Sequence, residues 1–549
     1  MALSKVSKRE ASLCDGLPTP LFGRTKSILM HLEKDWGLDA PFGVGRSLAD
    51  GRNLSPRKGE IPASRKPRWG FSKYGDGTPH GMVFFNGALI FARGTGLYST
   101  IDGFTVVTLA KVSDTHKSFV IFGDRLYIYP DKIYLRDRIT TRPLELDTGE
   151  IPDVEFLGKT IRLPQGYSWS NLGFEAGDCL NVLNIEKYNA APEGYYRIRS
   201  VDGETVTLYQ SLSNICTLPA RFKRVVPNLT ACCVSGDRVY GIAGKKIYVS
   251  AAGSATDFYS GPTGDGSHPA ILSSDANGDF TALSPWQGYV VFFKSDRICK
   301  LLGSRADSFI LQDRQGVGVP SALARTLCEV GDSLYYAAAG GVWRYRGQES
   351  EWICSFGDVA AQDGCGGTDG RAYYLSVSTG VKSRLSLYIP EEGRWYPEDD
   401  TMIGATLCHD GLLWIQETSG IIWTTASDGR VQRGGISEEN LNGPVIASMT
   451  LASDRSDEPA PICPTGLWVR ATGKSGSLRV FATYANGAAS RDATAESEVL
   501  LGKFSAPMTD RLLTLTPVAG LWDSVTVRVE TEGDWVIHDV IRRYDVMTD

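Results

Sequence analysis

Histidines, which are well suited to metal binding and proton transfer, are few and far apart in this chain. The six are His31, His80, His116, His268, His409 and His538. No two of them have the H-E-x-x-H or H-x-H spacing that can place two imidazoles on one metal ion. The phosphate-binding pattern G-x-x-x-x-G-K-[ST] and the nucleophile elbow G-x-S-x-G are also absent. We therefore expect no metal site and no cofactor.

Acidic residues offer the remaining route to catalysis, because glycoside cleavage uses two carboxylates about 5–9.5 Å apart. Two segments approach the sialidase Asp-box S-x-D-x-G-x-T-W, namely STIDGFT (99–105) and TASDGR (425–430). In the first, glycine follows Asp102 directly and Val106 stands in place of tryptophan. Asp296 and Asp332 occupy positions typical of turns. We expect no enzymatic activity, and a glycan-processing or glycan-binding protein stays open as an alternative.

The eleven cysteines include no C-x-x-C pair. Most of them stand among apolar residues, as Cys299 does in RICKLL and Cys354 in WICSF. This context is typical of buried free thiols. We expect no disulfide framework.

The charge of the chain is unevenly distributed. The 549 residues carry a net charge of −6, but residues 1–70 hold 13 Lys and Arg against 7 Asp and Glu. An acidic body argues against broad binding to nucleic acid, which needs a basic surface. Six cations near the end of this segment are predicted to contact a partner, and the alternative is that they only solvate a linker. They are Arg52, Arg57, Lys58, Arg65, Lys66 and Arg68.

The N-terminus has no apolar core of signal-peptide length, and no apolar stretch is long enough to span a membrane. We expect a soluble protein made in the cytoplasm.

The positioning elements are predicted by a repeat. A polar turn with glycine, an alternating apolar strand, a second turn and a second strand recur at seven glycines, with most spacings close to 40–50 residues. The seven are Gly87, Gly123, Gly236, Gly288, Gly331, Gly370 and Gly411. Such a period is typical of propeller blades, which bury both faces by radial packing. The chain is therefore predicted to be all-β, with a β-propeller of about seven blades; an array of β-sandwiches is the alternative.

Segments that break the repeat indicate further domains. Residues 76–149 are predicted to form blades one and two, and 219–438 blades three to seven. A strand–turn–strand series at 150–218 predicts a small β-barrel inserted between them. Six alternating strands over 439–549 predict a C-terminal β-sandwich. Residues 1–75 are expected to form an N-terminal arm with a short helix at 25–36, where apolar side chains have helical spacing.

Four segments resemble propeller proteins from the tails of double-stranded DNA bacteriophages. The segment 315–347 matches a blade pattern of that family, and 245–261 is similar to its preceding blades. The opening segment 48–70 and the last strand 534–546 are also similar. The matching positions in the first and third segments are Gly318, Pro320, Ser321, Gly331, Asp332, Gly341, Val342 and Trp343, and Asn53, Leu54, Ser55, Pro62, Arg65 and Arg68.

The resemblance implies a structural virion protein. Members of this family include the tail nozzle of short-tailed phages, a hexameric ring that closes the tail channel and then lets DNA pass. The expected partners are other copies of the chain, tail adaptor and fibre proteins, and DNA in transit. An adaptor propeller that carries receptor-binding fibres is the runner-up. We expect the inserted domain and the sandwich to build the ring, and deletion of residues 1–70 to leave a folded propeller that fails to assemble.

Overall fold

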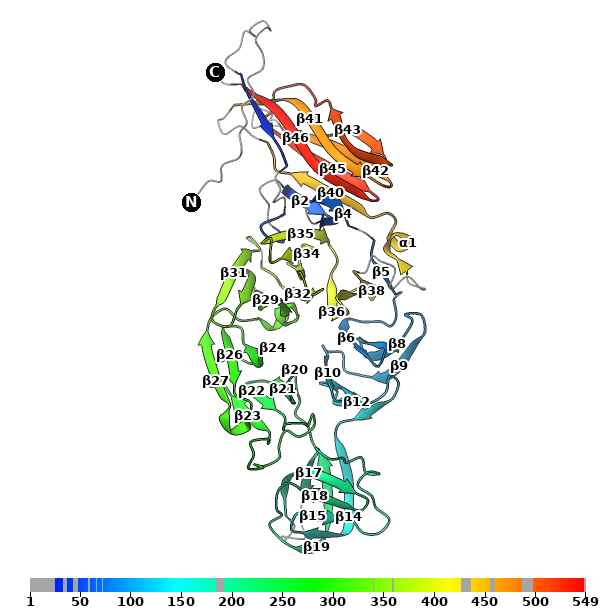
Figure 1. The fold of residues 1–549 in the computed structure, drawn as a ribbon, viewed down its shortest axis with the longest axis vertical. Helices are drawn as coiled ribbons and strands as arrows, with labels where there is room; N and C mark the ends of the chain where they lie inside the picture. Colours follow the sequence, from blue (N-terminus) through cyan, green and yellow to red (C-terminus); the bar gives the residue numbers. More distant parts are fainter. Residues whose placement is uncertain are drawn as a thin grey trace.

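The computed structural model places three β-domains in a line (Figure 1). A propeller occupies the middle, a small barrel lies at one end and a sandwich at the other. The described residues are 25–32, 37–42, 48–57, 60–65, 67–71, 73–183, 192–338, 340–357, 360–425, 436–454, 460–485 and 497–547. Nearly all regular structure in these ranges is strand, so the predicted all-β propeller fold class is confirmed.

Seven sheets of four or five strands make up the propeller within the described residues. We number them sheet 1 to sheet 7 in chain order. Sheet 1 holds β6 (Pro79–Phe85), β7 (Ala88–Arg93), β8 (Gly96–Thr100) and β9 (Val106–Lys111); sheet 2 holds β10 (Ser118–Phe122), β11 (Arg125–Tyr129), β12 (Ile133–Leu135) and β13 (Thr141–Pro143); sheet 3 holds β20 (Ala231–Ser235), β21 (Arg238–Ala243), β22 (Lys246–Val249) and β23 (Ala270–Ser273).

The other four sheets follow the same order along the chain. Sheet 4 holds β24 (Ala282–Trp286), β25 (Tyr289–Phe293), β26 (Arg297–Leu302) and β27 (Ile310–Gln315); sheet 5 holds β28 (Cys328–Val330), β29 (Ser333–Ala338), β30 (Gly341–Tyr345) and β31 (Ser350–Ser355); sheet 6 holds β32 (Asp363–Thr368), β33 (Tyr373–Ser378), β34 (Ser383–Ile389) and β35 (Arg394–Asp399); sheet 7 holds β36 (Ile403–His409), β37 (Leu412–Glu417), β38 (Ile422–Thr424), β5 (Trp69–Phe71) and β39 (Ile436–Ser437).

The first strands of these sheets form a closed ring. Each contacts the next in the order β6, β10, β20, β24, β28, β32 and β36, and β36 contacts β6 again. Apolar clusters fill the space between every adjacent pair of sheets. Strand β25 shows how the sequence builds these apolar interfaces: Val290 and Phe292 face sheet 3, while Val291 and Phe293 face sheet 5. Alternate side chains of a strand point to opposite faces, so one apolar run serves two interfaces.

The barrel is a single closed sheet inserted between sheets 2 and 3. Its strand order is β14 (Leu146–Leu157), β15 (Thr160–Arg162), β18 (Thr205–Leu208), β17 (Gly194–Asp202), β16 (Cys179–Leu183) and β19 (Cys216–Arg224). It has a core of its own, in which Trp169, Phe174 and Phe222 stack edge to face. The domain spans 146–224, slightly more than the predicted 150–218.

The sandwich consists of two sheets. One holds β3 (Leu54–Arg57), β4 (Glu60–Ser64), β46 (Trp535–Met547), β41 (Ile462–Gly473) and β44 (Met508–Leu515), with β1 (Thr25–Met30) beside β46. The other holds β2 (Leu48–Arg52), β40 (Ile446–Leu451), β45 (Ser524–Glu532), β42 (Ser477–Ala485) and β43 (Ser497–Ser505). The C-terminal sandwich thus also uses four strands from the first 64 residues.

The predicted helix at 25–36 is wrong where the structure describes it. Residues 25–30 form strand β1, which pairs antiparallel with the C-terminal half of β46. Ile28 and Met30 pack against the sandwich core. The long edge of β46 supplies backbone partners and an apolar face, and this tertiary setting overrides the local helical spacing. Residues 33–36 lie outside the described residues.

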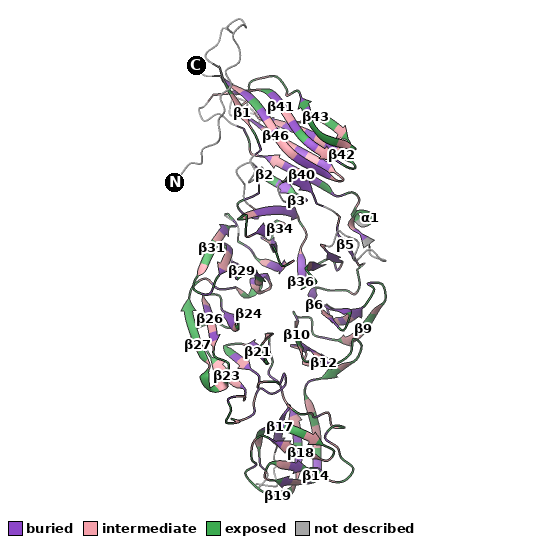
Figure 2. Cartoon of the chain, in the orientation of Figure 1, coloured by how far each residue is buried: buried purple, intermediate pink, exposed green. Residues whose placement is uncertain are grey.

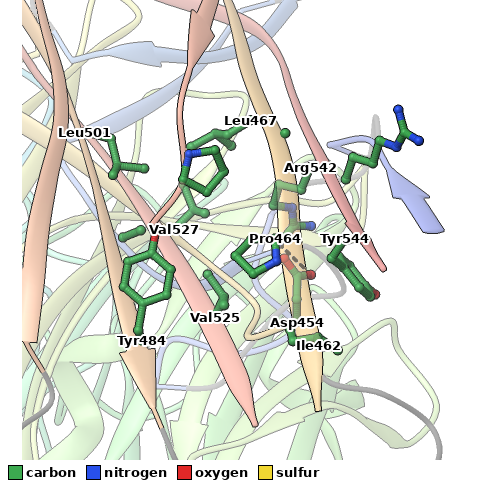
Figure 3. A pocket seen from close by; sticks show the side chains of 14 residues that line it. Asp454, Ile462, Pro464, Leu467, Tyr484, Leu501, Val525, Val527, Arg542 and Tyr544 are labelled. Atoms are coloured by element: carbon green, nitrogen blue, oxygen red, sulfur yellow. Dashed lines mark ion pairs between the residues drawn. The ribbon is translucent and has the colours of Figure 1, made fainter. Parts of the chain in front are cut away.

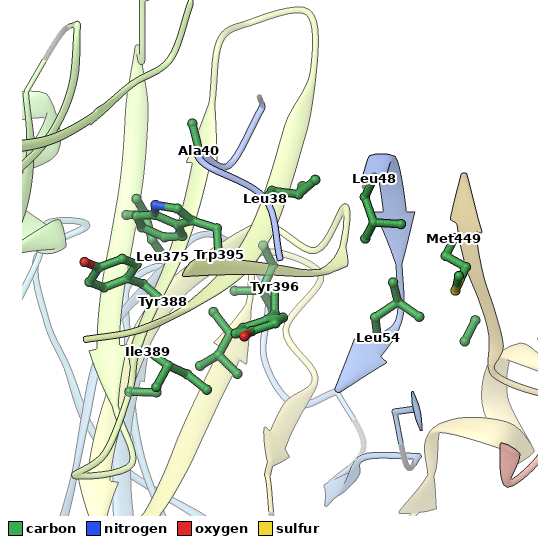
Figure 4. Packing of buried hydrophobic residues seen from close by; sticks show 14 of the residues in the cluster. Leu38, Ala40, Leu48, Leu54, Leu375, Tyr388, Ile389, Trp395, Tyr396 and Met449 are labelled. Atoms are coloured by element: carbon green, nitrogen blue, oxygen red, sulfur yellow. The ribbon is translucent and has the colours of Figure 1, made fainter. Parts of the chain in front are cut away.

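The described residues between 37 and 71 are also built into the fold, where they pack against the propeller and the sandwich. Leu38 pairs through its backbone with Trp395 of sheet 6. Figure 4 shows Leu38, Leu48 and Leu54 between the aromatic side chains of sheet 6 and Met449 of the sandwich. One apolar core therefore continues from the propeller into the sandwich. Farther along, β5 lies between β38 and β39 and completes sheet 7.

Candidate functional site

The six cations predicted as partner contacts do not stay together. Arg52 is exposed on β2 and lies 3.5 Å from the exposed Asp400. Arg57 belongs to β3. Lys58 and Lys66 lie outside the described residues. Arg65 and Arg68 are buried, with exposed fractions of 8% and 4%.

Arg65 and Arg68 form an arginine cluster with Glu398, Asp399 and Glu438. Arg65 donates from both terminal nitrogens to the two carboxylate oxygens of Glu438, each at 2.8 Å. Arg68 lies 2.6 Å from Glu398 and 2.9 Å from Asp399. This placement corrects the prediction for these two arginines, because their guanidinium groups are engaged and buried within the chain.

The cluster joins three parts of the molecule. Glu398 and Asp399 end β35 of sheet 6, and Glu438 begins the short helix α1 (Glu438–Asn442) after sheet 7. Burial by itself lowers the pKa of Arg68, but Asp399, Glu398 and Glu438 outweigh burial and raise this pKa above its usual value. Burial by itself would raise the pKa of Asp399, yet Arg68 and Arg65 hold it below its usual value. Arg68 and Asp399 therefore stay charged at neutral pH.

A large cavity, which we call the propeller channel, lies at the centre of the seven sheets. Residues from all seven sheets or the connections before them line it. Its charged or titratable lining groups include His116, Lys117, Arg325 and a single carboxylate, Asp279. Lys117 is held by Asp131 at 2.6 Å, and Arg325 by Asp363 at 2.7 Å.

His116 is the unusual group of the channel. Solvent reaches it, but the surrounding wall keeps out much of the bulk water, and this burial lowers its pKa to about 4. The nearby cations Arg325, His80 and Lys117 lower the pKa further. The imidazole is therefore neutral at pH 7.

A second cavity, much smaller, lies between the sheets of the sandwich (Figure 3). Its wall is mostly apolar, but a buried ion pair between Asp454 and Arg542, 3.0 Å apart, lies on one side. Burial raises the pKa of Asp454 to about 6, against the opposing pull of Arg542. The pair links the two sheets, since Asp454 also exchanges backbone hydrogen bonds with Val525.

The predicted turn acids behave as turn residues. The carboxylate of Asp102 accepts hydrogen bonds from the backbone of Phe104 and Thr105. Asp332 accepts one from Ser333. The ten described cysteines are free thiols, and of these Cys408 is exposed.

Within the described ranges, no three His, Cys, Asp or Glu side chains are grouped in a way that could hold a metal ion. No helix in the part of the chain that the structure describes is both long and apolar enough to cross a membrane.

The acidic partners of Arg65 and Arg68 were missed by sequence reasoning. The signal for them is the charge pattern: the run Glu398, Asp399, Asp400 and the pair Glu438, Glu439 are acidic where residues 52–68 are basic. The channel residues have no such signal, because His116 stands in a loop and Arg325 in a short 3-10 helix, far apart in the sequence. Only the closure of the ring brings them to one space.

No known protein family matches the chain, and no curated protein matches it. Solved structures that align with it include a computationally designed protein, Ika8, at 12% identity and a TM-score of 0.33, over 65% of this chain and 98% of that one. BamB from Moraxella catarrhalis aligns at 10% identity with a TM-score of 0.32, over 68% of this chain and 93% of that one. A catalytically inactive virginiamycin B lyase from Staphylococcus aureus aligns at 9% identity with a TM-score of 0.33, over 65% of this chain and 98% of that one. Similarity at this level says nothing about activity.

Proposed function

We propose that this chain is a structural virion protein of a bacteriophage tail, made in the host cytoplasm and assembled as a ring that forms part of the DNA ejection channel. The segments that resemble tail propellers suggest this role. The structural observation that supports the proposal is that two extra domains are joined to opposite edges of the propeller by polar contacts and a shared apolar core. Domains held in this way offer surfaces through which a subunit can bind other tail proteins.

Polar clamps hold the barrel to the propeller. Asp178 of the barrel accepts from Thr256 of the propeller at 2.7 Å and pairs with the buried Arg224 at 2.7 Å. Gln210 donates to the backbone of Gly261 at 2.9 Å. Arg125 of sheet 2 pairs with Glu175. Because several of these groups are buried, freeing the barrel would leave them without partners, which is costly.

The sandwich is held as firmly at the other edge. The arginine cluster and the shared apolar core join it to sheets 6 and 7. Arg384 of sheet 6 adds a contact of 2.8 Å with Asp50 of β2. The barrel, propeller and sandwich should therefore move as one body.

The channel supports a structural role over an enzymatic one. Acid–base cleavage of a glycoside uses two carboxylates, and the described channel lining holds only Asp279. The net charge of −6 also suits a conduit, since each basic phosphate contact adds affinity that would slow the passage of DNA.

Electron microscopy of the purified full-length chain, and of the virion that carries it, tests the proposal. We expect a closed ring of six copies in which the propellers surround a common axis. A chain that stays monomeric at every concentration and is absent from the tail would overturn it.

A further inference from the structure

We propose that neighbouring copies of this chain contact each other through the two flanks of the propeller that the barrel and the sandwich leave uncovered. The first flank is sheet 1, and the second is the boundary between sheets 4 and 5. This inference rests on the proposed ring, and it names the surfaces that build it. It shifts the main contacts from the appended domains to the propeller.

The order of the sheets places these flanks opposite each other. In a ring of seven sheets, the point opposite sheet 1 lies between sheets 4 and 5. The barrel, between sheets 2 and 3, is likewise opposite sheet 6, on which the sandwich sits. Figure 1 shows the long axis from barrel to sandwich, with β9 on one side of the propeller and β27 and β31 on the other. The appended domains thus leave both sides free.

The first flank projects apolar side chains. The turn between β8 and β9, together with β9, carries Ile101, Phe104 and Val107, which are 63%, 53% and 42% exposed. Strand β9 is the outermost strand of its sheet, so one row of its backbone groups has no partner within that sheet. Single exposed apolar residues are ordinary, but three within seven residues on an open edge form a patch.

The second flank is apolar and hollowed. Trp352 on β31 and Ile310 on β27 are 59% and 61% exposed, and both strands are outermost (Figure 2). A groove lies between sheets 4 and 5. Its lining is mixed: Ile298 and Val317 are apolar, and Arg314, Gln315, Gln348 and Glu349 are polar or charged. Ser350, which also lines the groove, is the first residue of the strand that carries Trp352.

The two flanks are complementary, which points to a second copy as the occupant. One flank projects a turn and the other offers a groove. Lys111 on β9 and Glu349 in the groove are both exposed and opposite in charge, and Arg314 lines the same groove. Two different surfaces of one subunit make a head-to-tail contact. Such contacts close into a ring when each copy is rotated relative to the next by a fixed fraction of a full turn, and otherwise they form an open filament.

The test introduces a negative charge on the first flank and a positive charge on the second flank of the full-length chain, first singly and then together. Phe104→Glu and Trp352→Lys should each weaken self-association at least about 30-fold, as expected for a large aromatic at the centre of an interface. The double variant should recover to within a few-fold of the unaltered chain, because Glu at 104 of one copy then faces Lys at 352 of the next. Analytical ultracentrifugation over a concentration series measures the dissociation constant for self-association of the two single variants and the double variant.

Val381→Glu is the matched control, since Val381 is 92% exposed on the hairpin of sheet 6, away from both flanks. Circular dichroism checks that every variant is folded. Rings that survive both single substitutions would overturn the flank contact while leaving the proposed tail function standing. Dissociation of the single variants without recovery in the double variant would overturn the head-to-tail pairing. An unaltered chain that never assembles would instead refute the proposed function itself.

Discussion

Arg52 and Arg68 belong to one basic segment but have opposite roles. Arg52 is exposed beside an exposed carboxylate, while Arg68 is buried between two carboxylates of sheet 6. A charge in water keeps its hydration, whereas a buried charge depends on its partners. The same residue type is therefore replaceable at one position and essential for stability at the other.

Replacing Arg68 with methionine should destabilise the chain by about 3 kcal/mol, because Glu398 and Asp399 would lose their nearest cation and keep only Arg65, at 3.9 and 3.6 Å. Arg52→Met is the matched control and should cost about 0–1 kcal/mol. Equilibrium unfolding in urea, followed by tryptophan fluorescence, measures both. Equal losses of unfolding free energy in the two variants would show that the arginine cluster contributes no more to stability than the exposed Arg52.

The buried Asp454 predicts a pH dependence of the sandwich. Because its pKa is raised to about 6 in the folded chain, the folded state binds more protons than the unfolded state between about pH 4 and 6. Its contribution to stability is therefore favourable below about pH 4 and is lost as pH rises to about 6.

Asp454→Asn should remove this dependence, since an amide does not titrate. Thermal unfolding of the two chains from pH 4 to 7 gives the comparison: the midpoint difference between them should change up to about pH 6 and then stay constant. A difference that is constant over the whole range would contradict the raised pKa.

At the scale of elements, the propeller is closed by a strand from the start of the chain. Strand β5 enters sheet 7 between β38 and β39 and passes very close to its neighbour. A Cβ at Gly70 would lie 2.0 Å from the carbonyl oxygen of Ile422 and 2.7 Å from the Trp423 ring. This position requires glycine for close approach rather than for a special backbone angle.

Gly70→Ala should therefore displace β5 and destabilise the chain by about 1–3 kcal/mol or more. Gly316→Ala is the control, because its Cβ would meet no atom within 4 Å. Limited proteolysis and denaturant unfolding report the result, and cleavage between sheets 7 and 1 should become faster only in the first variant. If both variants resist cleavage equally, β5 is not the closing element.

The repeat of glycine turns predicted the propeller, because each hairpin is a local structure whose signal lies within about forty residues. The placement of residues 25–71 could not be predicted in this way. The spacing of Ile28, Leu29 and Leu32 fits a helix, and only the edge of β46, far along the chain, makes residues 25–30 a strand. The burial of Arg65 and Arg68 likewise depends on acids more than 300 residues away. Removal of residues 1–70, expected to leave an intact propeller, would instead take away four strands and most of β5.

At the scale of the whole molecule, the acidic body and the channel with one carboxylate predict two negative results. A panel of fluorogenic glycosides should show no turnover by the full-length chain. Duplex DNA should bind more weakly than about 10⁻⁴ M at physiological salt, below the usual range of non-specific binding. An electrophoretic mobility shift assay at two salt concentrations measures the binding of duplex DNA. Turnover of any glycoside would favour the glycan-processing alternative.

The pairing of β1 with β46 has a consequence for synthesis. Ser27 bonds to Asp545, so two segments that are 518 residues apart in the sequence meet in one sheet. A ribosome that adds roughly 5–20 residues per second needs about half a minute to two minutes to make this chain. During that time the early strands wait without partners, with their edges open to other nascent chains. Only a completely translated polypeptide can finish its sandwich, so truncated products should aggregate rather than enter an assembly.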